Sequence, residues 1–157
     1  MIEMHEAIKR LILHEGLKLK PYKCPAGFLT VGVGRNVETN PITDEEKRVV
    51  GDWEHGITEN GAKYLLKNDI IKAYRECKKY IEFYKTLDDE RQYALLDMCF
   101  NLGIYRLLKF KKMLGAMEIG DYRGASKECL NSKYAKDVGE RAERIARTIE
   151  RGVFRYD

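Results

Sequence analysis

The sequence lacks any apolar run close to the roughly 18 residues that a membrane-spanning helix needs. Its opening segment, MIEMHEAIKRLILHEG, is interrupted by charged side chains and does not resemble the apolar core of a signal peptide. Internal repeats and low-complexity segments are also missing. The chain has 157 residues, of which 44% are hydrophobic and 34% charged, so we expect one globular domain.

Cysteine is scarce, and its spacing argues against the common cysteine motifs. The four cysteines lie far apart with no C-x-x-C pair, so neither a zinc site nor a redox pair is indicated. We therefore expect reduced thiols, no metal ion and no cofactor. Three of them, Cys77, Cys99 and Cys129, fall on apolar faces of predicted helices. Cys24 differs, because it lies in a polar turn beside Lys23. The charges of Lys20 and Lys23 favour the thiolate.

The charge of the chain is only slightly unbalanced. The net charge is +4 and the isoelectric point about 8.8, which favours an anionic partner without choosing among nucleic acid, lipid and acidic wall polymer. No zinc-finger or helix-turn-helix signature accompanies the excess, so we expect no nucleic-acid partner. Residues 137–152 carry four arginines that suit anionic lipid, but the interspersed glutamates favour an ordinary solvated helix face.

Hydrophobic periodicity predicts helices in most of the chain. Apolar residues recur at helical spacing from Ile2 to His14, and Thr58 is a suitable N-cap for a helix of about 22 residues, roughly 33 Å long. In the second half, glycines lie where the periodic pattern ends. The further predicted helices cover residues 94–102, residues 107–119, residues 121–132 with Asp121 as N-cap, and a last segment that begins after a capping box of Asp137 and Glu140 and ends at Gly152.

Residues 28–35 change to the two-residue period of a strand, after a Cys-Pro-Ala-Gly sequence that fits a type I turn. If the aliphatic side chains face the core, then Thr30, Gly32 and Gly34 face outward and let a bulky ligand lie against the backbone. The alternative is that the two glycines only permit a tight twist or bulge. A dinucleotide site is not indicated, since the third glycine and the flanking parallel strand and helix are missing.

Together these elements predict an α+β fold that is mainly α. A small antiparallel sheet lobe and a larger helical lobe are joined by the long helix, and a cleft between the lobes is the expected place for a ligand. The approximate division is residues 15–58 for the β-containing lobe, 59–81 for the connecting helix, and 1–14 plus 82–157 for the helical lobe.

Glu15 is a candidate proton donor. It lies at the end of the first predicted helix, where the helix dipole disfavours a negative charge. Partial burial at a crevice would also raise the pKa of its carboxyl toward the range of a general acid. The alternative is a solvated glutamate at a helix end.

Glu15, Cys24 and Thr30 are separated by eight and then five residues, and this pattern resembles the catalytic signature of the phage-type lysozymes. In that family a Glu, an Asp or Cys, and a Thr recur at these intervals. The similarity extends over most of the chain. The matching segments are residues 15–17, 22–23, 30–34, 57–58, 98–103, 141–142 and 151–152.

The resemblance implies an endolysin muramidase that hydrolyses β-1,4 bonds between N-acetylmuramic acid and N-acetylglucosamine in peptidoglycan and causes host cell lysis. By analogy, Glu15 protonates the leaving glycosidic oxygen, the residue at position 24 acts on the attacking water or stabilises the anomeric carbon, and Thr30 positions that water. Arg141 matches an arginine that pairs with the acid and orients it. The substrate-binding residues implied in the same way are Gly32, Gly34, Phe100, Asn101 and Tyr134, the last in place of a larger aromatic.

Cys24 departs from the pair of carboxylates that glycoside hydrolysis normally uses. It can act as a thiolate base, as a nucleophile, or as a polar placeholder, and we prefer the first role. A thiol without a second carboxylate also suits a lytic transglycosylase, which leaves anhydro-muropeptides. A non-enzymatic, cationic protein active on the cell wall or membrane is the remaining alternative.

The resemblance also implies the biological setting. The expected partners are peptidoglycan glycan strands and a separate holin for release. The protein is expected to be a monomer and to stay in the host cytoplasm until it is released to the cell wall.

Overall fold

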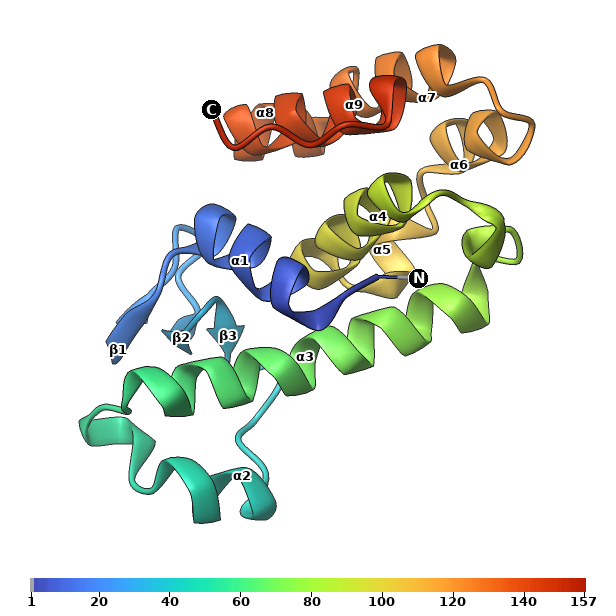
Figure 1. Cartoon of the computed structure of the whole chain (residues 1–157). Helices are drawn as coiled ribbons and strands as arrows, with labels where there is room; N and C mark the ends of the chain where they lie inside the picture. The colour runs from blue at the N-terminus through green and yellow to red at the C-terminus, as the bar shows by residue number, and fades with distance from the viewer. Residues whose placement is uncertain (1) are drawn as a thin grey trace. The chain divides into compact units, whose positions relative to one another are not determined.

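The computed structural model describes residues 2–157 and confirms the predicted α+β class with mainly helical content (Figure 1). The chain divides into two units inside the longest helix. The N-terminal unit is Met4–Ile71, and the C-terminal unit is Lys72–Asp157 together with Ile2 and Glu3. This grouping assigns the first helix to the unit that holds the strands, whereas the sequence analysis assigned residues 1–14 to the helical lobe.

The N-terminal unit begins with a helix that ends where the sequence predicts. Gly16, with a φ of 75°, donates its N–H to the Ile12 carbonyl at 2.8 Å and leads the chain out of the helix. Three strands, two short helical segments and most of the longest helix follow. The elements are α1 (Met4–Glu15), β1 (Lys18–Lys23), β2 (Leu29–Gly32), β3 (Arg35–Asn36), α2 (Asp44–Val50), the 3₁₀ turn Trp53–His55 and α3 (Glu59–Tyr80).

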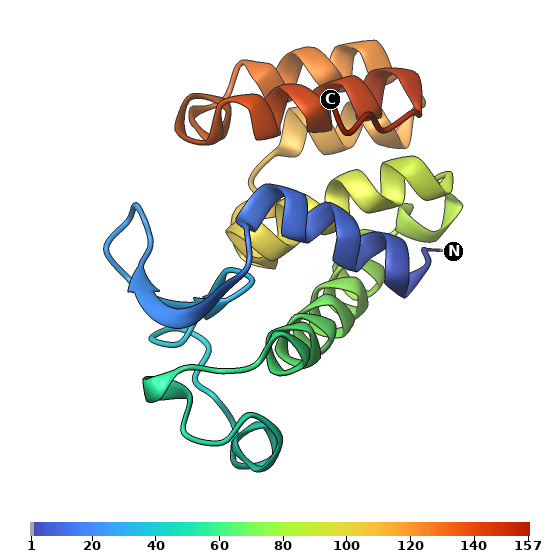
Figure 2. The same cartoon turned by 60° about the vertical axis from the view of Figure 1, so that its left-hand side comes forward.

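The strands form an antiparallel sheet in the order β1-β2-β3. The turn between β1 and β2 is the predicted one: Gly27 donates its N–H to the Cys24 carbonyl at 2.8 Å, with Pro25 in the second position. This turn lies at the end of the hairpin that extends away from the rest of the sheet (Figure 2). The register shifts between Lys18 and Tyr22, where Pro21 has no N–H to donate, and β1 is an edge strand, as proline requires.

The prediction of one strand from residue 28 to 35 is wrong. β2 ends at Gly32, and a turn through Val33 and Gly34 leads into β3. Gly32 and Gly34 both take positive φ angles, of 69° and 67°, which a residue with a Cβ rarely adopts. Thr30 is only 2% exposed and Val31 is fully buried, so the expected outward-facing row does not form. The glycines permit a tight turn, which was the alternative reading.

Helix α2 was missed in the sequence analysis. Its N-terminus carries a complete capping box, in which Thr43 Oγ1 accepts from the Glu46 N–H and the Glu46 carboxylate accepts from the Thr43 N–H. The predicted N-cap of the long helix is confirmed, because Thr58 Oγ1 accepts the Gly61 N–H at 2.9 Å. The core of this unit combines sheet, loop and α3 residues: Val31, Val37, Ile42, Ile57, Ala62 and Leu65.

The C-terminal unit is built around α4. Every residue from Gln92 to Cys99 is buried, which is typical of a helix surrounded by others, and α4 packs against α9. Helix α9 also packs against α7. The elements after α3 are the 3₁₀ turn Tyr84–Thr86, α4 (Asp89–Leu102), α5 (Ile104–Leu107), α6 (Lys111–Glu118), α7 (Tyr122–Leu130), α8 (Lys133–Val138) and α9 (Glu140–Arg151).

Two helix predictions in this unit need correction. The helix expected over residues 107–119 is interrupted at 108–110, so that α5 and α6 are separate. The capping box of Asp137 and Glu140 does not form, because Asp137 lies inside α8 and the N-cap of α9 is Gly139, which has no side chain to form a cap. Asp121 does cap α7, and Gly152 ends α9 in the left-handed conformation, as predicted. No helix in residues 2–157 combines the length and apolar character that crossing a membrane requires.

Candidate active site

Glu15 is the last residue of α1, and its half-buried side chain lies against the turn between β2 and β3. A Cβ built on Gly34 would come within 2.8 Å of the Glu15 carboxyl carbon and of its Oε1. Such a distance is a clash, so only glycine fits there while the carboxyl keeps this position. The positive φ at position 34 and the close approach of the Glu15 carboxyl thus both require glycine at this position.

Cys24 is the first residue of the β1–β2 turn, and Thr30 lies on the facing strand. The thiol is half-buried, whereas the Thr30 side chain is buried and its hydroxyl donates to the Phe28 carbonyl at 2.9 Å. The structure also brings the Thr30 hydroxyl within hydrogen-bonding reach of the Cys24 sulfur. Two of the three predicted catalytic side chains therefore contact each other.

The turn lowers the pKa of the Cys24 thiol. Burial acts in the opposite direction and would raise this pKa, but hydrogen bonds from the backbone of residues 26–28 and from the Thr30 hydroxyl outweigh it. The sequence analysis attributed a stabilised thiolate to two nearby lysines, Lys20 and Lys23. In the structure, the turn itself supplies the hydrogen-bond donors that favour the thiolate.

Tyr22 is a site residue that the sequence analysis did not single out. Burial is the main cause that raises the pKa of its phenol, and negative charge on Glu15 and on Cys24 raises it further. Tyr22 is thus within electrostatic reach of both groups, and it pairs with Thr30 across the sheet. The Lys18 ammonium lies 4.2 Å from the centre of the Tyr22 ring. Tyr22 therefore connects the acid at the end of α1 with the thiol and hydroxyl of the hairpin.

The other predicted substrate-binding residue of this unit, Gly32, faces inward. A Cβ on it would lie 3.5 Å from Ala62 Cβ and from Ile57 Cδ1, which is ordinary packing distance. Contact between a ligand and the backbone of Gly32 stays a prediction.

The remaining predicted site residues belong to the C-terminal unit. Arg141 is buried, and its Nε donates to Asp97 Oδ1 at 2.8 Å. Its predicted pairing with Glu15 stays a prediction. Phe100 and Asn101 are both half-buried in the last turn of α4. Within the described part of the chain, Asn101 Oδ1 is buried and accepts no hydrogen bond.

Tyr134 is buried in α8, where its ring contacts that of Phe110 edge-on with the centres 6.0 Å apart. Its sugar contact, like that of Phe100, was implied only by the resemblance. The structure places both residues in helices of the C-terminal unit, and their role in substrate binding stays a prediction.

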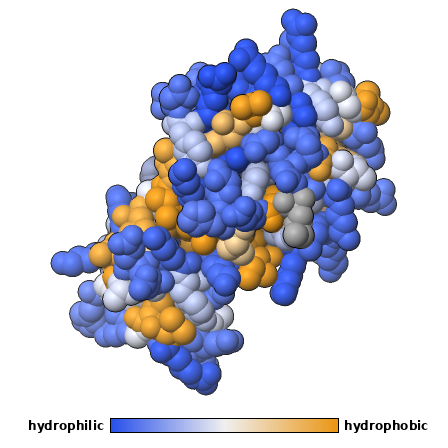
Figure 3. Space-filling model, viewed as in Figure 1, coloured by the Kyte–Doolittle hydropathy of each residue, from blue (hydrophilic) through white to orange (hydrophobic). Residues whose placement is uncertain are grey.

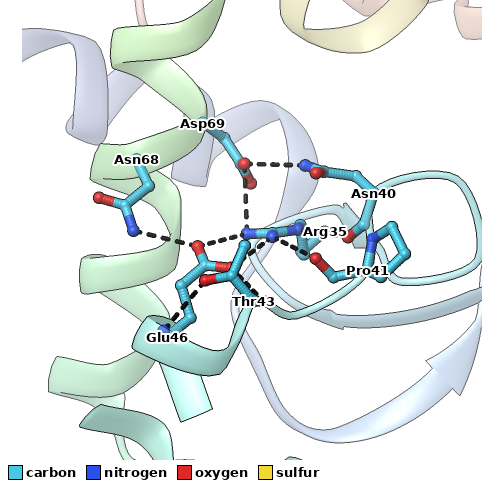
Figure 4. Close-up of polar contacts among 7 residues, drawn as sticks. All are labelled: Arg35, Asn40, Pro41, Thr43, Glu46, Asn68 and Asp69. Atoms are coloured by element: carbon cyan, nitrogen blue, oxygen red, sulfur yellow. Dashed lines mark hydrogen bonds and ion pairs between the residues drawn. The ribbon is translucent and has the colours of Figure 1, made fainter. Parts of the chain in front are cut away.

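A buried ion-pair network adjoins the Gly34 turn (Figure 4). The Arg35 guanidinium donates to both Glu46 oxygens, at 2.7 and 3.1 Å, and its Nη1 lies 3.2 Å from Asp69 Oδ1. It also donates to the carbonyls of Asn40 and Pro41, at 2.8 and 3.1 Å. The network joins β3 and the loop after it to α2 and α3.

The charges of this network favour the ionised form of Glu46. Burial acts to raise the pKa of the Glu46 carboxyl, but hydrogen bonds from Arg35 and Asn68, the Thr43 N–H and the charge of Arg35 lower it to about 2. The sequence analysis did not include Arg35 among the candidate site residues. The T-x-x-E pattern at Thr43 was the signal that would have placed Glu46 at a helix start.

Comparison with known proteins places the chain among the lysozymes, which are glycoside hydrolases that degrade peptidoglycan. Residues 13–149 match the family described as Phage lysozyme, and the chain therefore belongs to the phage lysozyme family. It is similar to "Probable T4-type lysozyme 1" of Dictyostelium discoideum, at 29% identity over 95% of this chain and 96% of that protein.

Two further relatives come from bacteriophages. An "Endolysin" of Acyrthosiphon pisum secondary endosymbiont phage 1 is 32% identical over 88% of this chain and 86% of the phage protein. The "Pre-baseplate central spike protein Gp5" of Enterobacteria phage T4 is 28% identical over 96% of this chain, which corresponds to 28% of that longer protein. Family membership makes this chain a glycoside hydrolase of the lysozyme type.

Proposed function

We propose that the enzyme is a muramidase that hydrolyses the β-1,4 bond between N-acetylmuramic acid and N-acetylglucosamine. The observation that carries the proposal is the arrangement around Tyr22 in the N-terminal unit. The Glu15 carboxyl is held against Gly34, the Cys24 thiol lies within hydrogen-bonding reach of the Thr30 hydroxyl, and negative charge on both Glu15 and Cys24 acts on Tyr22. Glycoside hydrolysis needs a proton donor and a second group that acts on water.

In this proposal the protonated carboxyl of Glu15 donates to the glycosidic oxygen as the bond to the anomeric carbon breaks. The Cys24 thiolate accepts a proton from the attacking water, whose oxygen forms the new bond to that carbon. Thr30 positions the water, a role proposed from the resemblance. One product then carries a new reducing end and the other a new hydroxyl.

Contacts to the sugar are proposed from the resemblance and from one feature of the structure. Asn101 Oδ1 is a buried acceptor with no hydrogen-bond partner in residues 2–157. A buried acceptor left unsatisfied costs about 1–3 kcal/mol, and the N–H of an acetamido group would satisfy it. From the resemblance, we propose Phe100 and Tyr134 as aromatic contacts to the sugar and Gly32 and Gly34 as backbone contacts.

Mass analysis of the digestion products tests the proposed reaction. Purified peptidoglycan treated with the enzyme is expected to yield muropeptides with reducing N-acetylmuramic acid ends, each heavier by one water than an anhydro end. Hydrolysis in ¹⁸O-labelled water should place the label at the new reducing end. Reducing N-acetylglucosamine ends would instead show that the other glycosidic bond is cleaved.

A lytic transglycosylase is the second candidate, and the thiol at position 24 favours it. That reaction needs one acid and no second carboxylate, because the 6-hydroxyl of the muramic acid closes on the anomeric carbon. Anhydro ends without incorporated label would establish this candidate and exclude the hydrolase.

Alkylation of Cys24 is expected to be fast and to inhibit the enzyme. The rate with iodoacetamide should rise as the pH increases through a pKa below the ordinary thiol value of about 8.5, because the thiolate reacts. The other thiols should react slowly, since they are buried. A hydrogen bond with Cys99, together with burial, raises the pKa of Cys77, and burial raises that of Cys129 to about 12. Mass spectrometry of peptides, paired with activity, measures both effects.

Two variants separate loss of the thiolate from simple obstruction by the added group. Cys24→Ser removes the base without adding bulk and is expected to lower kcat by about 10²-fold or more. Cys24→Asp restores a second carboxylate and should retain activity. Full activity of Cys24→Ser, or of alkylated enzyme confirmed by mass at this residue, would show that the thiol has no role in the reaction.

We also propose the setting that the resemblance implies. The enzyme acts in host cell lysis as a monomer, stays in the host cytoplasm until a separate holin releases it, and then reaches the glycan strands of the wall. The endolysin relative supports this setting by its name.

A further inference from the structure

The C-terminal unit holds a second feature that the proposed hydrolysis does not use. Four arginines and one valine line a small, open hollow with a cavity volume of about 70 Å³. We call it the arginine hollow (Arg144, Arg147, Arg151, Val153 and Arg155). We propose that the arginine hollow binds phosphate groups of a water-soluble polymer, independently of the reaction at Glu15.

The helix and the turn after it bring these side chains together. Arg144, Arg147 and Arg151 are spaced by three and then four residues, so they lie on one face of α9. Gly152 ends the helix in the left-handed conformation, with a φ of 70° and a ψ of 23°. The chain then runs back along α9 (Figure 1) and returns Arg155 to the same hollow.

Arg91 of α4 fixes the geometry of that turn. Its Nε donates to the Ile149 carbonyl at 2.6 Å and its Nη2 to the Glu150 carbonyl at 3.0 Å. These are carbonyls of the last helical turn, which have no partner within the helix. A Cβ on Gly152 would also come within 3.0 Å of Arg91 Nη1. The wall of the hollow is therefore held from outside, before any ligand binds.

The charges of the hollow are not neutralised within the described residues. No acidic side chain lines it, and no ion pair is formed there by Arg144, Arg147 or Arg155. The Arg151 guanidinium is 65% exposed and lies 3.9 Å from the Glu150 carboxylate, a weak contact. The Arg144 Nε is buried and donates no hydrogen bond. Like charges this close repel one another, and an anion would relieve the repulsion and satisfy the buried donor.

Phosphate fits this arrangement better than carboxylate does. Guanidinium groups form paired hydrogen bonds with either anion. A carboxylate offers two oxygens in one plane, whereas a phosphate offers acceptor oxygens in several directions. The arginines that line the hollow come from the helix face and from the returning chain, so a tetrahedral anion can meet guanidinium groups from both segments.

The surroundings of the hollow argue against a bilayer as the source of the phosphate. A helix that lies in a membrane interface presents apolar side chains to the lipid. The apolar residues of α9, such as Ile145 and Ile149, are buried inside the unit. On the face seen in Figure 3, the surface over α8, α9 and the C-terminal segment is mostly hydrophilic. A polymer with repeated phosphodiesters therefore suits the hollow, since it brings charge without needing an apolar anchor.

Binding of poly(glycerol phosphate) at low salt tests the proposal. We expect saturable binding by calorimetry, shifts of the Arg144 Nε–Hε signal in NMR spectra, and weakening near 1 M salt, where charges are screened beyond about 3 Å. Arg144→Gln with Arg147→Gln should weaken binding by about tenfold or more, because hydrogen bonds to charged groups are lost. The matched control is Arg106→Gln with Arg123→Gln, which removes the same charge from exposed positions and should change binding less than about threefold.

Further measurements show whether a loss of polymer binding comes from misfolding or from a change in catalysis. Arg155→Gln alters only the exposed C-terminal segment and should also weaken binding, and circular dichroism verifies each fold. Hydrolysis of phosphate-free peptidoglycan should be unchanged in all these variants. If the variants of the hollow and the control variants lose the same amount of binding affinity, the binding depends only on net charge, and the proposal is overturned. Binding to phosphatidylglycerol vesicles but not to the polymer or to inorganic pyrophosphate would also overturn it.

Discussion

Replacing Glu15 with glutamine is expected to lower kcat on peptidoglycan by about 10²–10⁴-fold, the usual loss when a general acid is removed. Glutamine keeps the shape of the side chain, so it still fits beside Gly34. It cannot donate a proton to the leaving oxygen as a carboxyl does. Two assays measure the change: the loss of turbidity of a cell-wall suspension, and the rate of hydrolysis of a defined soluble muropeptide oligomer.

The matched control for this experiment is Glu45→Gln on α2. Glu45 is exposed and has no interaction among the described residues, so its substitution should leave activity and the melting temperature unchanged. Far-UV circular dichroism of Glu15→Gln establishes that the fold is intact. If Glu15→Gln retains more than about one tenth of the wild-type activity, Glu15 is not the proton donor. Loss of a general acid lowers the rate by about 10²-fold or more, which would leave about one hundredth of the activity or less.

The position of Glu15 depends on contacts that are distant in the sequence. The carboxyl lies at the end of α1, but the residue that confines it is Gly34 in the turn after β2. That turn is followed at once by Arg35, whose buried guanidinium joins β3 to α2 and α3. The acid is therefore held by a tight turn, and the turn is held by an ion-pair network.

Local signals in the sequence were sufficient for several elements. Thr58 caps α3, and Pro25 lies in the turn between β1 and β2. Gly152 takes the left-handed conformation at the end of α9. In each case a side-chain cap, a fixed φ or a permitted positive φ acts within a few residues, so no tertiary contact was needed to predict it.

Other elements depend on contacts that periodicity does not record. The strand predicted over residues 28–35 failed because Gly32 and Gly34 take positive φ angles and the chain turns through residues 33–34, which the alternating sequence pattern does not record. Helix α2 is short, and its capping box at Thr43 was overlooked. The N-cap of α9 is Gly139 and not the expected Asp137, because Asp137 is still part of α8.

The candidate site divides in the same way. The spacing of Glu15, Cys24 and Thr30 in the sequence indicated the family, and the structure brings the last two into contact. Tyr22 and the turn N–H groups that stabilise the thiolate were not predicted, because strand pairing and turn geometry place them. The lowered pKa of Cys24 thus comes from backbone and Thr30 hydrogen bonds in the folded hairpin, whereas the sequence suggested the charges of Lys20 and Lys23.

Replacing Arg35 with leucine is expected to lower the free energy of unfolding by about 3–5 kcal/mol, because the carboxylates of Glu46 and Asp69 lose their buried partner. Such a loss is a large share of the roughly 5–15 kcal/mol that stabilises an ordinary domain. Urea denaturation followed by circular dichroism at pH 7 measures it. Arg48→Leu, on the exposed face of α2, is the matched control and should change stability by no more than about 0.5 kcal/mol.

The pH dependence of this loss identifies its cause. Because Arg35 holds the pKa of Glu46 at about 2, below the ordinary value of about 4.3, the ionised carboxylate stabilises the fold fully above about pH 5. As the pH falls toward 2, Glu46 becomes protonated and the wild-type protein loses this contribution. The variant has no such contribution to lose, so the difference in stability between the two proteins should shrink over the same interval. A difference that stayed constant from pH 7 to pH 2 would mean that Arg35 stabilises the unit by packing and by its hydrogen bonds to the Asn40 and Pro41 carbonyls, with no net gain from its charge.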